Sequence, residues 1–190
     1  MTAACQSHFI LGGARSGKSR YALAQAQSER RRTAVLATAQ ARDPDMAARI
    51  ARHQAERPSA WTTVEEPLDI AAACRRLVGR HDLILIDCLT VWVSNLLRRG
   101  DGDDAVLAAA DDLAKLVGER AVSLIVVSNE VGEGVHPPTA LGLRFRDLLG
   151  SVNQRVAAAA DRVTLMVAGI PMTIKDVPPA ADHELPPEAP

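Results

Sequence analysis

Short apolar segments alternate with amphipathic segments along the chain, and this pattern predicts strands that alternate with helices. Five brief runs rich in valine, isoleucine and leucine are typical of buried strands, and they span residues 8–11, 33–37, 83–86, 123–127 and 163–167. Six segments with helical spacing lie between these runs, at residues 18–29, 44–56, 68–77, 90–97, 104–119 and 140–160. Residues 61–64 suit a further short strand. The alternation predicts βαβ units and a three-layer α/β fold with a mostly parallel central sheet.

The domain organisation expected from the sequence is simple. A length of 190 residues fits about one domain, and the chain shows no internal repeat. Residues 176–190 contain five of the eleven prolines and no Lys or Arg. We therefore expect one domain over residues 1–175, followed by a flexible, proline-rich tail over residues 176–190.

Charge and cysteine content exclude several classes of protein. The net charge is −1, which argues against a nucleic-acid-binding protein, although residues 1–60 carry 10 Lys and Arg against 4 Asp and Glu. The three cysteines lack CxxC or zinc-ligand spacing. The least polar stretch, residues 83–97, is 15 residues long, which is shorter than the ~18–20 residues of a membrane span. No signal peptide precedes it, so we expect a soluble, cytoplasmic protein without a membrane span.

One motif adds chemistry to this picture, because residues 12–19 fit the pattern G-x-x-x-x-G-K-[ST] of phosphate-binding loops (P-loops). Its members are Gly12, Gly13, Ala14, Arg15, Ser16, Gly17, Lys18 and Ser19. Backbone N–H groups and the following helix N-terminus would surround phosphate oxygens, Lys18 would contact the β- and γ-phosphates, and Ser19 would ligate Mg²⁺. The alternative, a glycine-rich turn that matches by chance, fits less well because a strand and a helix flank the motif.

A second motif lies at residues 83–87, where an apolar strand ends in the carboxylate Asp87. Strands of this kind hold Mg²⁺ in P-loop proteins, and in a parallel sheet their carboxyl ends share an edge with the P-loop. A structural alternative is a strand that ends in Asp because the next turn favours it. No N-K-x-D or D-x-x-G element appears where a signalling GTPase would need its base and switch contacts, which disfavours a switch protein.

His53 is the histidine with the most informative position. Helical spacing places Met46, Ile50 and His53 on one face of the 44–56 segment. From spacing alone, a hydrogen-bonded core histidine is the simpler interpretation. The functional alternative is a nucleophile that attacks phosphorus, since a neutral imidazole is available near pH 7. Four arginines near it in sequence could neutralise phosphate charge or form a solvated basic face: Arg42, Arg49, Arg52 and Arg57.

Several segments taken together resemble one known family. They are the P-loop, residues 45–50 leading to His53, Arg57-Pro58 and Trp61, residues 87–90 with 95–97, residues 128–132, and residues 145–147 followed by 152–155. The sequence is similar to the bifunctional adenosylcobinamide kinase/adenosylcobinamide-phosphate guanylyltransferases of cobalamin biosynthesis. The resemblance runs from about residue 9 to about residue 175, and the ordered combination is more specific than the P-loop alone.

The resemblance implies a RecA-like P-loop fold, a homotrimer and a corrinoid small-molecule substrate. It implies phosphorylation of the aminopropanol hydroxyl of adenosylcobinamide with ATP or GTP. Transfer of GMP from GTP to that phosphate would follow, giving adenosyl-GDP-cobinamide and pyrophosphate. The position that matches the guanylylated histidine is His53, and Lys18 matches the P-loop lysine. The family's remaining nucleotide contacts match Thr38, Ala39, Gln40, Gln54, Ala55, Glu56, Arg57, Glu65 and Asp87.

Two alternatives remain at this stage. Another small-molecule P-loop kinase would phosphorylate its acceptor and keep His53 as a structural residue. A nucleotide-dependent regulatory protein would bind nucleotide without converting a corrinoid.

Overall fold

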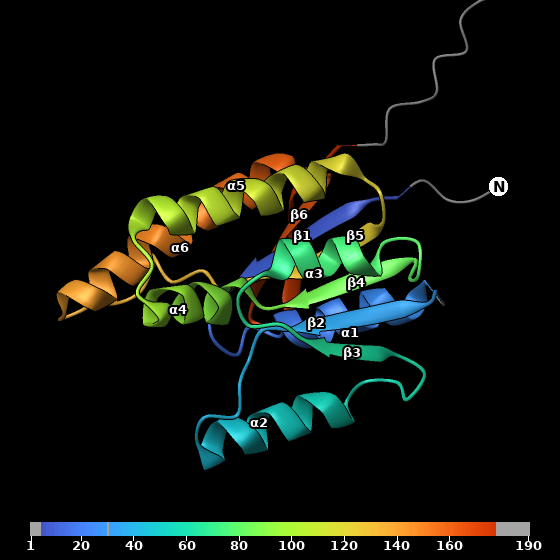
Figure 1. The fold of residues 1–190 in the computed structure, drawn as a ribbon, viewed down its shortest axis with the longest axis horizontal. Coiled ribbons are helices and arrows are strands. Elements are labelled where there is room, and N and C mark those ends of the chain that lie inside the picture. The colour runs from blue at the N-terminus through green and yellow to red at the C-terminus, as the bar shows by residue number, and fades with distance from the viewer. Residues whose placement is uncertain (1–4, 30, 178–190) are drawn as a thin grey trace, which may run out of the picture.

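The computed structural model describes residues 5–29 and 31–177, which form a seven-stranded sheet surrounded by helices (Figure 1). The strands are β1 (Ser7–Gly12), β2 (Thr33–Ala37), β3 (Thr62–Glu65), β4 (Leu83–Asp87), β5 (Ser123–Val127), β6 (Arg162–Val167) and β7 (Ile170–Asp176). The helices are α1 (Lys18–Ser28), α2 (Pro44–Ala55), α3 (Ile70–Leu77), α4 (Leu89–Arg99), α5 (Asp103–Glu119) and α6 (Ala140–Ala159). These bounds confirm the predicted elements to within about two residues at nearly every end.

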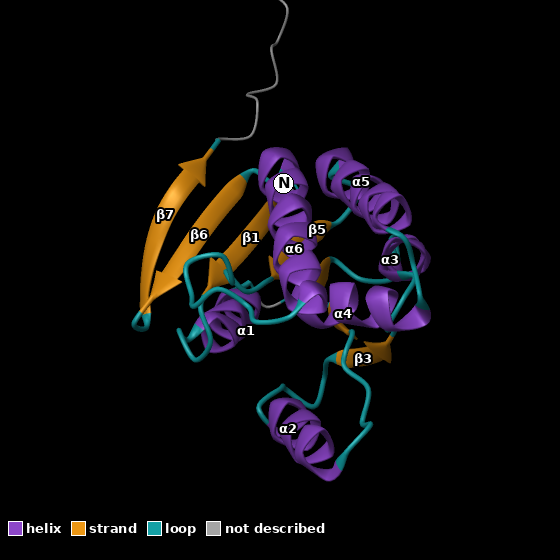
Figure 2. Ribbon diagram, turned by 90° about the vertical axis from the view of Figure 1, so that its left-hand side faces the viewer, coloured by secondary structure: helices purple, strands orange, loops and turns teal. Residues whose placement is uncertain are grey.

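The strand order is β3-β2-β4-β5-β1-β6-β7, and every pair is parallel except β6–β7. Helix α1 packs on one face against β1, β4 and β5, whereas α3, α4, α5 and α6 cover the other face. Figure 2 shows α3 to α6 grouped together and α1 apart from them. The three-layer α/β fold with a mostly parallel sheet is therefore confirmed.

Alternating strand residues divide the core between the two faces, because successive side chains of a strand point to opposite sides. Phe9 of β1 lies in the cluster with α3 to α6, whereas its neighbour Ile10 packs in the smaller cluster with Ala22 and Ala26 of α1. Both strand residues are fully buried. The short, uniformly apolar runs of the sequence thus correspond to strands covered on both faces.

Strand β7 was not predicted, and it corrects the expected start of the tail. The strand is an antiparallel edge strand whose residues are almost all exposed, so its sequence lacks the buried apolar run used to find the others. Asp176, assigned to the tail from the sequence, belongs to β7, and the Val177 N–H donates to the Asp161 carbonyl (2.9 Å). The rest of the predicted tail, residues 178–190, lies outside the described residues.

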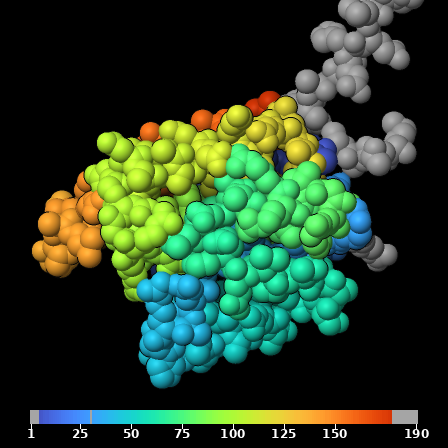
Figure 3. All heavy atoms as spheres, in the orientation of Figure 1, coloured from blue at the N-terminus to red at the C-terminus, as the bar shows by residue number. Residues whose placement is uncertain are grey.

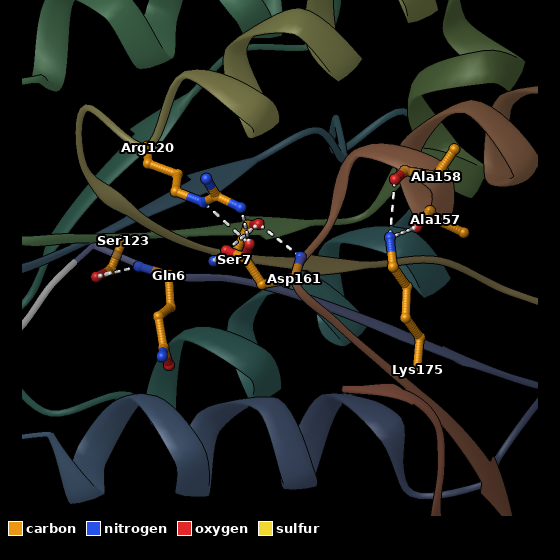
Figure 4. A network of polar contacts seen from close by, with 8 residues as sticks. All are labelled: Gln6, Ser7, Arg120, Ser123, Ala157, Ala158, Asp161 and Lys175. Carbon is orange, nitrogen blue, oxygen red and sulfur yellow. Dashed lines mark hydrogen bonds and ion pairs between the residues drawn. The ribbon is translucent and has the colours of Figure 1, made fainter. Parts of the chain in front are cut away.

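The buried carboxylate of Asp161 connects the start of β1 to Arg120 at the amino edge of the sheet (Figure 4). It accepts hydrogen bonds from the Ser7 N–H (2.8 Å) and hydroxyl (2.9 Å), and from two nitrogens of Arg120 (3.0 and 2.5 Å). Burial acts to raise the pKa of Asp161, but the hydrogen bonds from Arg120 and Ser7 outweigh it and lower the pKa. Lys175 of β7 donates to the carbonyls of Ala157 and Ala158 and so caps the end of α6.

Helix α2 lies apart from the main body, beyond β3 in Figure 1, and forms the lower border of the molecule in Figure 3. Its start follows the sequence closely, with Asp43 as N-cap accepting from the Met46 N–H (2.7 Å) and Pro44 at the first helical position. None of its residues is buried. Among the described residues, no helix is long and apolar enough to span a membrane.

Candidate active site

The P-loop connects β1 to α1 and is held in a tight curve. A Cβ on Gly12 would lie 2.5 Å from the Ser16 hydroxyl and 2.8 Å from the Met166 carbonyl, so only glycine fits there. Gly17 has a left-handed φ of 93° at the N-cap of α1. Lys18 Nζ donates to the Gly13 carbonyl (3.0 Å), so the ammonium lies across the mouth of the loop. The loop therefore presents backbone N–H groups and one ammonium to an anion.

The pKa of Lys18 is lowered from its ordinary value, mainly by burial and also by the neighbouring guanidinium of Arg49. Asp87 and Cys88 act in the opposite direction and raise it. These opposing effects show that Lys18, Arg49 and Asp87 lie in one electrostatic environment, although they come from α1, α2 and β4.

The backbone that carries the Asp87 carboxylate, at the end of β4, is hydrogen-bonded to the residue that follows β2. Thr38, which directly follows β2, is completely buried, and its hydroxyl donates to the Cys88 carbonyl (2.8 Å) and accepts from the Cys88 N–H (3.0 Å). The Asn95 side chain donates to the Thr38 carbonyl (2.8 Å). Thr38 thus fixes the backbone that carries Asp87 and does not line either cavity described below.

His53 lies beside Asp87 at the carboxyl edge of the sheet. Its Nδ1 is 3.6 Å from Asp87 Oδ2, and Arg57 Nη2 is 4.0 Å from the same oxygen. The His53 side chain is 26% exposed, and none of the residues of α2 is buried. The face of α2 that carries Met46, Ile50 and His53 lines a cavity. The interpretation of His53 as a core histidine is therefore wrong. Burial lowers the pKa of Arg57, and Asp87 and Glu65 counteract part of that effect.

Two neighbouring cavities share His53 and Arg49. The first, of about 740 Å³, is lined by the P-loop, α2 and the β6–β7 turn; its members include Ala14, Arg15, Ser16, Gly17, Lys18, Ser19, Arg20, Arg49, Arg52, His53 and Asn129. The second, of about 50 Å³, lies beneath α2; its members include Ala37, Ala39, Met46, Arg49, Ile50, His53, Gln54, Arg57, Glu65 and Asp87. We refer to them as the P-loop cavity and the α2 cavity. Together they contain most of the residues singled out from the sequence.

Six of those residues line neither cavity, and Thr38, described above, is one of them. Gln40 lines a third cavity of about 230 Å³ at the start of α2, together with Arg42, Arg98 and Phe145. Ala55 and Glu56, at the end of α2, are exposed and line neither the P-loop cavity nor the α2 cavity. Gly12 is buried behind the loop and Gly13 offers its carbonyl to Lys18.

Sequence reasoning missed the β6–β7 turn as part of the site. The Gly169 N–H donates to the Ser16 carbonyl (3.0 Å), and Ala168 and Gly169 line the P-loop cavity. Both residues have positive φ values, 50° and 84°, as two-residue hairpin turns require. Two small residues between two strand-like runs were the available signal. Asn129, held by the Thr90 hydroxyl and the Asn153 side chain, was also missed as a lining residue.

The chain matches the family model for cobinamide kinase / cobinamide phosphate guanyltransferase over residues 8–174. A bifunctional adenosylcobalamin biosynthesis protein, CobP, from Pseudomonas aeruginosa is 44% identical over 89% of this chain and 97% of that protein. Two proteins of the same description, both CobU, are 38% identical in Salmonella typhimurium and 36% identical in Escherichia coli. Each alignment covers 87% of this chain and 98% of the relative.

Two solved structures share the fold at low sequence identity. A prototypical ATPase from a bacterial type III secretion system aligns with a TM-score of 0.56 and 14% identity over 84% of this chain and 50% of its own. A KaiC-like protein from Pyrococcus horikoshii aligns with a TM-score of 0.50 and 13% identity over 84% of this chain and 70% of its own. These similarities establish the RecA-like P-loop fold expected from the sequence.

Proposed function

The chain belongs to the cobinamide kinase / cobinamide phosphate guanyltransferase family, and we propose that both of its reactions use the P-loop cavity, with His53 as the nucleophile of the second. It is a bifunctional transferase of adenosylcobalamin biosynthesis, which replaces the two alternatives left open by the sequence. The first reaction phosphorylates cobinamide, and the second transfers GMP to cobinamide phosphate. The observation that carries the proposal is that His53, Lys18 and Ser19 line one cavity.

In the kinase reaction, the P-loop N–H groups and Lys18 bind the phosphates of ATP or GTP, and the hydroxyl of the aminopropanol arm attacks the γ-phosphorus. Phosphoryl transfer requires mainly positioning and charge stabilisation, which the loop and helix N-terminus supply. The cavity is bordered by exposed residues of α1 and α2, so it is accessible from solvent to the corrinoid acceptor.

The donor set fits Mg²⁺. The Ser19 hydroxyl and the Asp87 carboxylate are hard oxygen ligands, and Mg²⁺ completes its coordination with phosphate oxygens and water. Such an ion would neutralise charge on the phosphates.

In the guanylyl transfer, a ring nitrogen of His53 attacks the α-phosphorus of GTP and pyrophosphate leaves. The contact between Asp87 and Nδ1 supports Nε2 as the attacking atom, because the carboxylate orients the ring from its other side. The acceptor phosphate then displaces the histidine. Two in-line displacements give net retention at the α-phosphorus.

The nucleotide contacts proposed from the resemblance divide between the cavities. P-loop residues 14–19 line one, whereas the other, beneath α2, is lined by Ala39, Gln54, Arg57, Glu65 and Asp87. Thr38 would act by positioning Asp87, and Gln40 by bordering the neighbouring cavity. Ala55 and Glu56, which are exposed at the end of α2, stay predictions of the resemblance.

We also propose the homotrimer implied by the resemblance, with β7 at its interface. Val167 and Ile170 are cross-strand partners, as are Leu165 and Met172, so their side chains share one face of the β6–β7 hairpin. Val167, Ile170 and Met172 are 48–65% exposed, and exposed apolar side chains gathered on one face are typical of an interaction surface.

The test uses GTP labelled on the α-phosphate, followed by denaturation and peptide mapping. We expect an acid-labile, base-stable label on the peptide that contains His53. His53→Asn should abolish this label and GMP transfer while retaining kinase activity, and Lys18→Ala should damage both reactions. Equal loss of both activities in folded His53→Asn protein would contradict the proposal. Unlabelled wild-type protein that binds GTP would contradict it as well.

A further inference from the structure

The arginines of this protein fall into two groups by their partners. The structure describes 18 of the 19 arginines, all except Arg30, and eleven of them lie within ion-pair distance of a carboxylate. Seven have no such partner among the described residues: Arg15, Arg20, Arg42, Arg49, Arg52, Arg80 and Arg98. Within residues 5–29 and 31–177, these seven guanidiniums are therefore left without a counter-charge.

The seven arginines are not scattered over the surface. Arg15, Arg20, Arg49 and Arg52 line the P-loop cavity, and Arg42 and Arg98 line the third cavity at the start of α2. Arg80 alone lies elsewhere, in the turn between α3 and β4. On a basic surface that only contacts solvent, arginines without ion-pair partners would not gather around two cavities. This distribution therefore indicates that the cavities bind anions.

The clustering of these arginines is electrostatically unfavourable in the protein without a bound ligand. Arg49 and Arg52 are three residues apart on α2, where like charges repel, and Arg49 contributes to the lowered pKa of Lys18. Bound phosphates would relieve this repulsion. One nucleoside triphosphate already has the P-loop amides, Lys18 and the helix N-terminus, so four additional guanidiniums exceed what a single triphosphate requires.

The two α2 arginines differ in position. Arg49 lines both the P-loop cavity and the α2 cavity and is close enough to Lys18 to affect its pKa, so its charge adds to that of the nucleotide site. Arg52 lines the P-loop cavity but not the α2 cavity, and it directly precedes His53. Arg52 and His53 therefore line the same cavity, whereas Arg52 takes no part in the α2 cavity that holds Asp87.

We propose that Arg52 binds the phosphate monoester of the acceptor in the second reaction. This assignment rests on the proposed function, because it requires GMP on His53. An acceptor phosphate oxygen attacks the α-phosphorus, a P–O bond forms and the P–N bond breaks. The bonding electron pair returns to the ring nitrogen of His53, and the product carries a pyrophosphate link. The attacking and attacked groups are both anionic, and a planar guanidinium that lines the same cavity as His53 offsets their repulsion through a two-point contact.

The experiment compares three reactions in Arg52→Ala, Arg52→Lys and the control Arg80→Ala. Self-guanylylation uses α-labelled GTP without acceptor, the kinase assay uses cobinamide, and the transfer assay adds cobinamide phosphate to preformed GMP-enzyme. For Arg52→Ala we expect KM for cobinamide phosphate to rise roughly 10- to 100-fold, as for loss of a charged hydrogen bond. Self-guanylylation and KM for cobinamide should change less than about twofold.

Arg52→Lys should recover part of the affinity, because a lysine keeps the charge without the fork. Arg80→Ala should leave all three reactions unchanged, since Arg80 is exposed, has no carboxylate partner in the described part of the chain and lines none of the three cavities. Parallel loss of self-guanylylation and transfer in Arg52→Ala would overturn the assignment in favour of nucleotide binding. Unchanged transfer would overturn it in favour of a solvated side chain. Absence of label on wild-type His53 would instead reject the proposed function itself.

Discussion

His8 shows how the environment of one side chain creates a dependence on pH. Burial, and to a smaller extent the charge of Arg162, lower its pKa from 6.5 to about 4. Its Nε2 lies 2.8 Å from the Thr164 hydroxyl, and its ring meets Tyr21 edge to face at 6.1 Å. The imidazole is therefore neutral in the folded protein under conditions where an unfolded chain begins to protonate it.

We expect this histidine to destabilise the fold as pH falls from about 6.5 to about 4, because only the unfolded state binds the proton in that range. The contribution is up to about 3 kcal/mol. Denaturant unfolding of wild type and His8→Asn at several pH values measures it. The stability advantage of the wild type should shrink steadily below pH 6.5, and parallel pH curves would contradict the expectation.

At the level of single residues, the chemistry was more predictable than the contacts. The motif at residues 12–19 and the strand ending in Asp87 identified the phosphate-binding edge, because these patterns encode a local geometry. The interpretation of His53 needed the structure, since helical spacing does not show whether a face meets a core or a cavity. Thr38 acts on the Asp87–Cys88 backbone, and this contact depends on the adjacency of β2 and β4, which no local pattern reports.

Among the structural elements, the P-loop illustrates how two adjacent glycines can differ. A Cβ at Gly12 would lie 2.8 Å from the Met166 carbonyl of β6, a backbone atom that cannot move independently of the sheet. A Cβ at Gly13 would have no atom within 4 Å. The loop is therefore anchored at its first glycine and open at its second.

Gly12→Ala should lower stability by roughly 1–3 kcal/mol, the usual cost of inserting a methyl group into a filled space. The melting temperature should fall by roughly 2–12 °C for a chain of this size. Thermal unfolding without nucleotide tests this, with Gly13→Ala as the matched control. Equal melting temperatures for the two variants would show that the loop adapts to the methyl group at either position.

Element boundaries were predictable where they follow from local chemistry. Asp43 and Pro44 mark the start of α2. Helix α4 ends at Arg99, two residues later than predicted, where Gly100 adopts the left-handed conformation. Helix α3 begins at Ile70, two residues later than its pattern indicated, because Glu66 accepts the N–H groups of Leu68 and Asp69. Strand β7 escaped prediction because an exposed edge strand is defined by its partner and not by its own burial.

For the molecule as a whole, the sequence indicated the layers correctly, because alternation of strands and helices restricts the topology to a few solutions. It could not indicate that β5 lies between β1 and β4 or that α2 lies beyond the sheet. Both follow from packing between segments distant in sequence. The assembly proposed for the chain is a property of this same scale.

Met172→Glu should weaken the proposed trimer, because a carboxylate would have to enter an apolar contact. We expect the wild type at about 61 kDa, three times the chain mass of 20.2 kDa, and the variant at lower mass in size-exclusion chromatography with light scattering. Thr173→Glu is the matched control, since Thr173 is exposed and pairs with Thr164, on the opposite face of β7. A monomeric wild type, or identical behaviour of the two variants, would contradict an interface on this face.

The hydrogen bond from the Gly169 N–H to the Ser16 carbonyl has a thermodynamic consequence. The β6–β7 hairpin presents the exposed apolar face proposed for the trimer interface, and the turn of the same hairpin contacts the P-loop. If nucleotide stabilises the turn that association also stabilises, then each event must strengthen the other by the same free energy. Dilution of the protein would then weaken its affinity for GTP, and GTP would in turn hold the subunits together at concentrations where the free protein dissociates.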